Sequence, residues 1–393
     1  MLNLIKNFLV TLLTTSMLTM VTIAQADWTS TLGDLWDQTK AKTANLSGVF
    51  NPSKPVEIGI AYGTEKKPWF EWAIAEFAKT EEGKKIKITL IPIGSIEGAE
   101  QILQKDERIQ VWSPASSVVE ELLVEPWEKE YKKNPIISDA PLALTPLVMV
   151  MWQDRYGAFI TKYTEVNFKN IASALAEITG WTAIANQPEW GVFNFGHTNP
   201  TLSNSGLLTL VLMAYDYADV FRDLSVKQVM NEGFITWLKE TEGAMSTEEE
   251  STNNLIKTML QRGPSEFSGI VTYENLALSN LNIAEGRWGK LQIVYPTRSV
   301  WNDNPYYILD TPWSNEEKQN AAKLFQKFLL SARAQKEARD KYLFRPASLE
   351  VPILDNDSAF SKLKDVVKID VATIKRPKAE VLQQLIQLWK KVQ

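Results

Sequence analysis

The sequence predicts a mixed α/β protein of two lobes, built on two parallel-rich sheets with flanking helices and joined by two crossing segments. Three observations support this fold class. Three strand–loop–helix units follow one another between residues 56 and 123, a near-continuous apolar strand starts after Pro146, and a second crossing strand appears at residues 291–296. Consecutive strand–loop–helix units favour a parallel sheet with crossover helices.

The elements of the first lobe can be assigned in order from apolar runs and helical spacing. They are strand 56–61, helix 69–78, strand 86–91, helix 96–103, strand 109–112 and helix 118–123. The loop after each strand carries Gly, Ser or Thr. In open α/β sheets ligands bind beyond the carboxyl ends of the strands, so we expect these three loops to share one rim.

The second lobe is expected to span residues 146–295, between the crossing strands 147–152 and 291–296. It contains a polar loop that starts at Phe195 and leads into an apolar helix ending around Tyr217. The chain then returns with strand 307–309, an amphipathic helix 315–340 and a terminal helix 378–391. We therefore expect a discontinuous first lobe, made of residues 55–145 plus 296–393 and preceded by a leader segment, residues 27–54.

The N-terminus is typical of a secretory signal peptide. Lys6 supplies the positive charge, residues 8–23 are mainly apolar, and Ala24-Gln25-Ala26 fits the small-x-small cleavage rule. We expect cleavage after Ala26 and export to the periplasm. An uncleaved membrane anchor is the alternative, for which the apolar run is short. The chain has no Cys, which excludes disulfides, thiolate catalysis and a lipid-modified cysteine.

Composition and charge narrow the classes of function. The net charge of −5 and scattered basic residues give no support to nucleic-acid binding. The single histidine, His197, lies in a Gly-Thr-Asn-Pro loop, which favours structural hydrogen bonding over a role as catalytic base. Neither a transition-metal site of Cys and several His nor EF-hand spacing is present. We expect no catalytic residue, no metal and no cofactor; a hydrolase with paired carboxylates is a less favoured alternative.

The junction at residues 195–208 is the most informative feature for binding. A polar loop that enters an apolar helix leaves backbone N–H groups without intrahelical partners, here beside Ser203, Asn204 and Ser205. Such a start attracts an anion or an electron-rich ligand, although simple helix capping is the competing interpretation. The full set of candidate ligand-binding residues is Gly63, Thr64, Gly94, Ser95, Ser113, Ser116, Ser117, Ser203, Asn204, Ser205, Tyr273 and Glu274.

The last two candidates have distinct expected roles. Tyr273 could donate its phenol or stack on a ligand, and Glu274 could bind a cation or a hydroxyl group. Packing between the lobes is the alternative for both.

Several short strings resemble one family. They are VWSPASS at 111–117, PLVMVMW at 146–152, EWG at 189–191, GHTNPTLSNSG at 196–206, ST at 251–252, GP at 263–264, YEN at 273–275, YP at 295–296, PW at 312–313 and FRP at 344–346. They resemble bacterial extracellular solute-binding proteins of the type 2 periplasmic-binding fold. The branch is often fused to a von Willebrand factor A domain and is distantly similar to molybdate- and sulfate-binding proteins. This chain has no room for that domain, and it carries Arg298 where relatives would have an acidic or small residue.

The resemblance covers nearly the whole chain from about residue 55 and implies a function. The protein is expected to capture a small ligand between its lobes by hinge closure, as a monomer, and to deliver it to an ABC-type membrane transporter. An anion is one candidate ligand. The alternative is an exported module of the cell envelope that recognises a ligand or a protein without transport.

Overall fold

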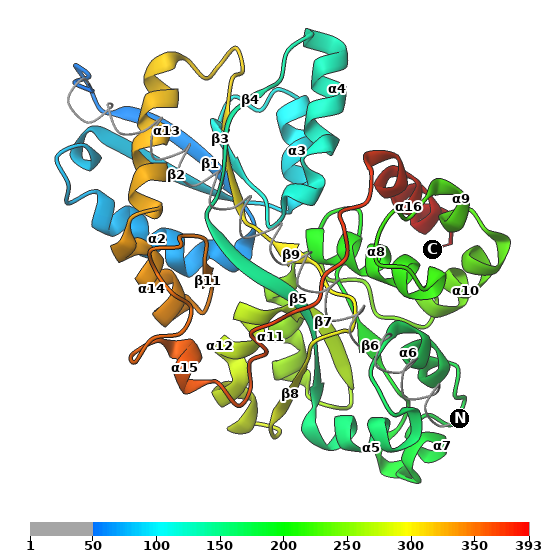
Figure 1. Cartoon of the computed structure of the whole chain (residues 1–393). Coiled ribbons are helices and arrows are strands. Elements are labelled where there is room, and N and C mark those ends of the chain that lie inside the picture. Colours follow the sequence, from blue (N-terminus) through cyan, green and yellow to red (C-terminus); the bar gives the residue numbers. More distant parts are fainter. Residues whose placement is uncertain (1–49, 393) are drawn as a thin grey trace, which may run out of the picture.

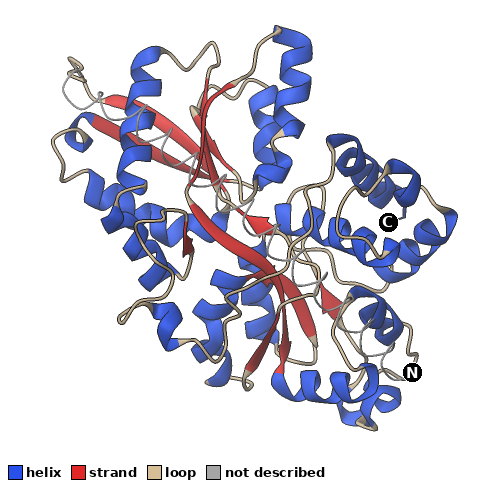
Figure 2. Cartoon of the chain, viewed as in Figure 1, coloured by secondary structure: helices blue, strands red, loops and turns tan. Residues whose placement is uncertain are grey.

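The computed structural model describes residues 50–392, which form two sheets surrounded by helices (Figures 1 and 2). The predicted signal peptide and residues 27–49 of the predicted leader lie outside the described residues. Within residues 50–392, no helix combines the length and the apolar character that crossing a membrane would require.

The first sheet has the strand order β2-β1-β3-β10-β4. The strands are β1 (Val56–Tyr62), β2 (Ile86–Pro92), β3 (Val111–Ser113), β4 (Ile136–Pro141) and β10 (Pro305–Leu309). β1 pairs in parallel with β2 and β3, as expected from the strand–loop–helix units, whereas β10 pairs antiparallel with β3 and β4.

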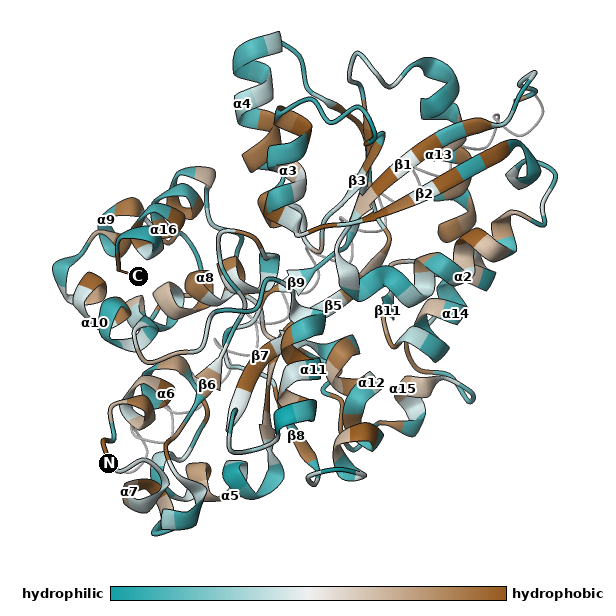
Figure 3. Ribbon diagram, turned by 180° about the vertical axis from the view of Figure 1, so that it is seen from behind, coloured by the Kyte–Doolittle hydropathy of each residue, from teal (hydrophilic) through white to brown (hydrophobic). Residues whose placement is uncertain are grey.

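Helices cover both faces of the first sheet (Figure 1). α2 (Lys67–Phe77), α13 (Glu316–Leu329) and α14 (Ala332–Tyr342) lie on one side, and α3 (Ser95–Leu103) and α4 (Glu121–Tyr131) on the other. Ile58 and Ile60 of β1 are buried in the core with Phe70 and Phe325. Apolar residues predominate in β1 and β2, whereas brown and teal alternate along helices such as α3, α10 and α16 (Figure 3), as burial of one helix face requires.

The second sheet is organised around the long strand β5 (Ala143–Trp152). Its path is β11-β5-β7-β6, and β8 and β9 also pair with β5. These strands are β6 (Phe195–Gly196), β7 (Gly269–Tyr273), β8 (Leu291–Val294), β9 (Trp301–Asn302) and β11 (Arg345–Pro346).

The fold class is confirmed as mixed α/β with two sheets and flanking helices. The expectation that both sheets are parallel-rich is wrong for the second sheet. β5 pairs antiparallel with β7, β8, β9 and β11, and only β6 and β7 are parallel. The physical reason is direction: β5 runs away from the first sheet, and the strands beside it run back toward that sheet.

The direction of these strands places their ends where the sheets meet. β7 runs antiparallel to β5, so its last residue, Tyr273, lies beside Leu147 near the beginning of β5. β6 is parallel to β7 and ends on the same side. The carboxyl ends of β6 and β7 therefore point toward the first sheet.

The helices around the second sheet form two groups (Figure 1). α5 (Gln153–Tyr163), α11 (Thr252–Arg262) and α12 (Glu274–Glu285) pack close to the strands. The other group is centred on α8 (Asn204–Ala218) and includes α6 (Phe168–Leu175), α9 (Val226–Val229), α10 (Glu232–Glu242) and α16 (Ala379–Val392). Residues 204–215 of α8 are all buried, so this helix is the core of its group.

Within residues 50–392 the chain passes between the two sheets by two paired passages and, after α14, once more to reach β11, which pairs with β5. It leaves the first sheet after Pro141 at the end of β4, and it returns between Asn302 of β9 and Pro305 of β10. The paired passages lie side by side, since Leu142 N donates to Asn304 O at 3.2 Å and Asn304 Nδ2 donates to Ala143 O at 3.0 Å.

The division into lobes at residues 146 and 295 stays a prediction. Two sets of contacts bear on where the lobes begin and end. After β8 the chain pairs once more with β5 through β9 before it leaves the second sheet. The terminal helix α16 packs on α8, α9 and α10, so residues 379–392 contact the predicted second lobe although they were assigned to the first.

The helix expected over residues 315–340 is two helices. α13 ends at Leu329 and α14 begins at Ala332, where Ser331 Oγ accepts a hydrogen bond from Ala334 N. The Ser331 side chain bonds a backbone N–H of the next helix, so the first helix can end there and a second one begin. The predicted helix 118–123 likewise becomes a short 3-10 turn, Ser117–Val119, followed by α4.

Candidate functional site

A small cavity lies where strand ends and helix starts from both sheets meet. We call it the inner cavity; its volume is about 20 Å³. One water molecule needs about 10–15 Å³ on the same scale, so the cavity holds a compact group. Its walls are Gly63, Thr64, Glu65, Ile93, Gly94, Ser95, Ser203, Asn204, Glu250, Ser251, Thr252 and Tyr273.

The fold explains why these residues converge. β1 ends at Tyr62 and β2 at Pro92, so the segments 63–65 and 93–95 emerge at the same edge of the first sheet. Opposite them, Tyr273 ends β7, and helices α8 and α11 start at Asn204 and Thr252. The segment Thr64–Lys66 contacts α11 across the gap.

Three helices, α3, α8 and α11, therefore begin at the inner cavity. The first N–H groups of a helix have no intrahelical partner, and the helix dipole makes this end positive. Side-chain capping does not occupy all of them: neither Gly94 at α3 nor Ser203 at α8 caps its helix, whereas Ser251 Oγ accepts from Asn254 N in α11. The helix start at α8 thus offers free donors to a ligand.

Asn204 is the central side chain of the inner cavity. It is 1% exposed, and its Nδ2 donates to Tyr273 Oη and to Asn302 Oδ1, both at 2.9 Å. Its Oδ1 has no hydrogen-bond partner within residues 50–392. Because an unsatisfied buried acceptor costs about 1–3 kcal/mol, this oxygen marks a position where a ligand or a water donates.

Tyr273 is buried on the opposite side of Asn204. Burial raises the pKa of Tyr273 well above its ordinary value, and the charge of nearby Glu65 raises it further. The phenol is therefore neutral. Tyr273 Oη accepts from Asn204 Nδ2, and the hydroxyl groups of Thr252 and Ser205 also lie within hydrogen-bonding reach of it.

Glu65 brings a carboxylate to the inner cavity, where it is 7% exposed. Lys66 Nζ lies 2.5 Å from Glu65 Oε1 and also donates to Pro114 O at 3.2 Å and to Asn304 Oδ1 at 3.0 Å. Burial lowers the pKa of Lys66, and the negative charge of Glu65 opposes that shift. An ammonium group has three N–H donors, so Lys66 has none left after its bonds to Glu65, Pro114 and Asn304.

A cluster of hydroxyl groups lies behind the cavity wall. Ser205 Oγ is 2.7 Å from Thr198 Oγ1, 2.6 Å from Thr252 Oγ1 and 3.3 Å from Ser203 Oγ. Ser205 thus connects the start of α8 to the start of α11. It supports the helix starts and does not line the inner cavity.

Seven of the twelve candidate residues line the inner cavity: Gly63, Thr64, Gly94, Ser95, Ser203, Asn204 and Tyr273. The other five, including Ser205, do not. Ser113 is buried, and its carbonyl accepts from Gly63 N. Ser116 Oγ accepts from Val118 N in a local cap, and Ser117 donates to Asp303 through both its N and its Oγ.

Glu274 is also placed away from the inner cavity. Its carboxylate accepts two hydrogen bonds of 2.7 Å from Arg345 and one of 2.5 Å from Tyr295. It is fully buried, so the expectation that it could bind a cation or a hydroxyl of a ligand is replaced by a structural ion pair. Of the residues that sequence reasoning missed, Glu65 and Thr252 stand out; Glu65 directly follows the Gly63-Thr64 loop that was singled out.

His197 and Arg298 both bond to other groups of the protein. His197 is buried, with Nδ1 2.8 Å from Thr198 O and Nε2 3.1 Å from Glu242 Oε1, and Glu242 Oε2 accepts from Trp389 Nε1 of α16. Burial alone would lower the pKa of His197, but the charge of Glu242 and both hydrogen bonds outweigh it and raise the pKa. Arg298 pairs with Asp216 and Asp219 at the end of α8.

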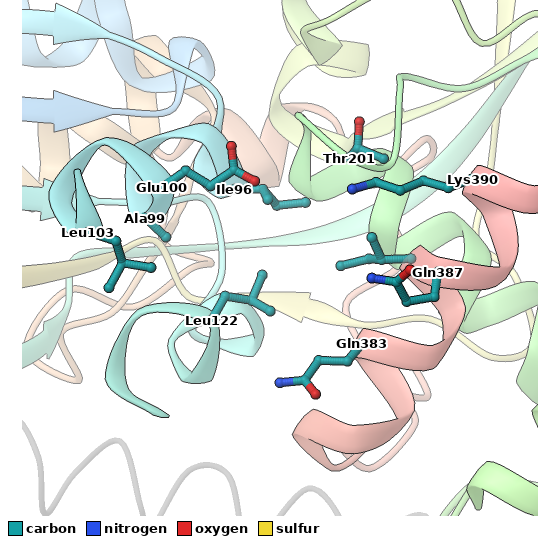
Figure 4. Close-up of a pocket in the computed structure, with 10 residues that line it drawn as sticks. Ile96, Ala99, Glu100, Leu103, Leu122, Thr201, Gln383, Gln387 and Lys390 are labelled. Atoms are coloured by element: carbon teal, nitrogen blue, oxygen red, sulfur yellow. The ribbon is translucent and has the colours of Figure 1, made fainter. Parts of the chain in front are cut away.

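A second, larger cavity of about 260 Å³ lies between α3, the start of α4 and α16 (Figure 4). Its walls are Ile96, Ala99, Glu100, Leu103, Leu122, Thr201, Gln383, Ile386, Gln387 and Lys390. The polar side chains among these, Glu100, Gln383, Gln387 and Lys390, are exposed. We favour the inner cavity as the functional site because it contains buried polar groups, including an acceptor without a partner. Residues 50–392 contain no cluster of three or more His, Cys, Asp or Glu residues that could hold a metal ion.

The sequence profile of the bacterial extracellular solute-binding proteins matches residues 58–342, and the chain belongs to this family. Its description is that of extracellular solute-binding proteins. A comparison with curated proteins finds no significant match.

Solved structures show the same fold at low sequence identity. The sulfate-binding protein SubI from Mycobacterium tuberculosis H37Rv is 14% identical with a TM-score of 0.54, over 83% of this chain and 96% of that one. A substrate-binding protein of an ABC transporter from Agrobacterium tumefaciens is 13% identical with a TM-score of 0.58, over 88% and 96%. The ferric binding protein from Campylobacter jejuni is 15% identical with a TM-score of 0.57, over 85% and 99%.

Proposed function

We propose that this extracellular solute-binding protein captures a small solute in the inner cavity by closure of its two lobes, and delivers it to an ABC-type membrane transporter. The observation that carries the proposal is Asn204 Oδ1, a buried acceptor with no partner within residues 50–392 that belongs to the cavity wall. Residues on both sheets surround it, so a solute held there contacts both lobes.

Contacts across the gap support closure as the mode of capture. Ile96 N at the start of α3 is 3.4 Å from Leu202 O in the loop before α8. Before α14, the chain of residues 50–392 connects the two sheets only through the paired passages at residues 142 and 303–304. Two adjacent linkers of this kind suit a hinge, because a few residues can absorb the change in backbone angles.

An anionic solute fits the three helix starts, whose free N–H groups and dipoles favour negative charge. Delivery to a transporter and export to the periplasm are supported by the family and by the Agrobacterium tumefaciens neighbour, which is named as part of an ABC transporter. We infer cleavage after Ala26 from the sequence, and mass spectrometry of the exported protein tests it.

A thermal-shift screen of the exported protein tests the proposal. The panel contains oxyanions, amino acids, sugars and polyamines. A compound that binds only the native state adds about 2.7 kcal/mol of stability at a hundred times its Kd, so one class should raise the Tm. The proposal fails if no compound raises the Tm of protein that is folded by circular dichroism.

A further inference from the structure

We propose that the inner cavity selects an oxyanion that keeps a proton, of the phosphate type, against sulfate and molybdate, and that Glu65 accepts a hydrogen bond from the protonated oxygen. This inference rests on the proposed function, because it names the class of solute for the same site. It starts from the donors and acceptors that the cavity wall presents.

The donors of the inner cavity suit an anion. They are the N–H groups at the starts of α3, α8 and α11, other than Ile96 N and Asn254 N, which donate to Leu202 O and Ser251 Oγ. Donors alone would bind any small oxyanion and would not distinguish phosphate from sulfate.

The acceptors make the distinction. Glu65 Oε1 is held by Lys66, while Glu65 Oε2 makes no hydrogen bond within residues 50–392. Asn204 Oδ1 is the second acceptor without a partner there. A ligand that satisfies both oxygens must carry O–H or N–H donors, and among the small oxyanions only one that keeps a proton on an oxygen can donate.

The negative charge of Glu65 strengthens the requirement that the ligand carries a proton. A carboxylate beside a fully deprotonated oxyanion repels it in a largely buried site, where screening by water is weak. With a proton between them, the same two oxygens form a charge-assisted O–H···O⁻ hydrogen bond, which is short and strong. The ammonium of Lys66 offsets part of this repulsion, but its three donors go to Glu65, Pro114 and Asn304, so it offers no hydrogen bond to the ligand.

At neutral pH phosphate and arsenate keep at least one proton, whereas sulfate and molybdate keep none. The chemistry of the wall therefore indicates a protonated tetrahedral oxyanion.

Titration calorimetry at pH 7 with phosphate, arsenate, sulfate and molybdate tests the inference. The wild-type protein should bind phosphate and arsenate at least a hundredfold more tightly than sulfate and molybdate. Glu65→Gln should reduce the ratio of phosphate to sulfate affinity at least tenfold, because the new amide N–H can donate to sulfate. Glu128→Gln is the matched control, since Glu128 is exposed on α4 and does not line the cavity, and it should leave the ratio within threefold.

If Glu65→Gln does not fold, the comparison of phosphate and sulfate affinities of the wild-type protein still tests the inference. Equal or tighter binding of sulfate or molybdate by the wild type overturns it. If none of the four ions binds, but another compound raises the Tm of the wild type and not of Asn204→Ala, capture of a solute stands and the phosphate-type ligand is wrong. If no compound binds at all, both proposals fail.

Discussion

Asn204 and Ser205 are neighbours at the start of α8, yet they have different surroundings. Asn204 points an acceptor at the inner cavity, whereas the Ser205 hydroxyl is bonded to Thr198 and Thr252 behind the wall. Asn204→Ala should weaken ligand affinity by about ten- to a hundredfold, the equivalent of about 1.5–3 kcal/mol for a hydrogen bond to a charged group. Ser205→Ala should lower the stability by about 1 kcal/mol and leave the affinity within a few-fold.

Calorimetry with the compound found in the screen, together with thermal unfolding of both variants, distinguishes the two roles. Equal losses of affinity in both variants, or an Asn204→Ala affinity within twofold of the wild type, would refute this assignment.

His197 gives the molecule a pH-dependent contribution to stability. Its pKa is raised in the folded protein because Glu242 and the Thr198 carbonyl outweigh the effect of burial. Because the pKa of His197 is higher in the folded protein than the unfolded value of 6.5, its protonation stabilises the folded state. This contribution is complete below pH 6.5 and is lost as the pH rises through the folded-state pKa. The Tm should therefore fall above about pH 6.5, and His197→Gln should remove most of that fall.

The chain has a single histidine, so His197 is the only side chain that ordinarily titrates near neutral pH. Tm measurements between pH 5 and 9 on both proteins check the prediction. An unchanged slope in His197→Gln would show that the stabilisation comes from another group.

The sequence locates the candidate site at the residue level only in part. Gly63, Gly94, Ser203 and Tyr273 were found because each lies at a strand end or a helix start, and such positions can be predicted from local patterns. Local patterns do not show which hydroxyl groups are already used. Ser116 is a cap, and Ser117 binds Asp303, a residue 186 positions further along the chain.

At the level of elements, the start of α3 meets the loop before α8 in a close backbone approach. A Cβ on Gly94 would lie 2.4 Å from Leu202 O, although the φ of −61° at Gly94 suits any residue. Gly94→Ala should therefore leave each lobe folded but oppose their approach, and we expect at least a tenfold loss of affinity with little change in Tm.

Gly157→Ala in α5 is the matched control, because a Cβ there would meet nothing within 4 Å. It should bind like the wild type in the same titration. If Gly94→Ala binds equally well, this contact does not contribute to closure.

Strands β1, β2 and β3 of the first sheet could be predicted because their apolar runs end at Gly, Ser or Pro, whereas β4 was not expected from the sequence. Strand direction in the second sheet could not, since the antiparallel partners of β5 come from residues 269–346, far along the chain. The break between α13 and α14 was missed for a local reason: Leu330 and Ser331 include neither Gly nor Pro, the usual markers of a helix end.

At the level of the whole molecule, capture of a solute requires that the two sheets with their helices move relative to each other about the paired passages at residues 142 and 303–304. The order of strands and helices and the family resemblance both predicted the two-sheet α/β class, and the structure confirms it. The position of α16 could not be predicted from its amphipathic pattern. That pattern shows a buried face, but not that α8, α9 and α10 cover it.

A distance measurement between the lobes tests capture by closure most directly. The chain has no Cys, so spin labels can be attached to Glu128→Cys in α4 and Glu240→Cys in α10, two exposed helical positions on opposite sides of the inner cavity. Double electron–electron resonance should show a broad or longer distribution of distances between the labels without ligand. With ligand bound it should show one narrow, shorter distance. An unchanged distribution with a compound that raises the Tm and loses binding in Asn204→Ala would contradict capture by closure of the lobes.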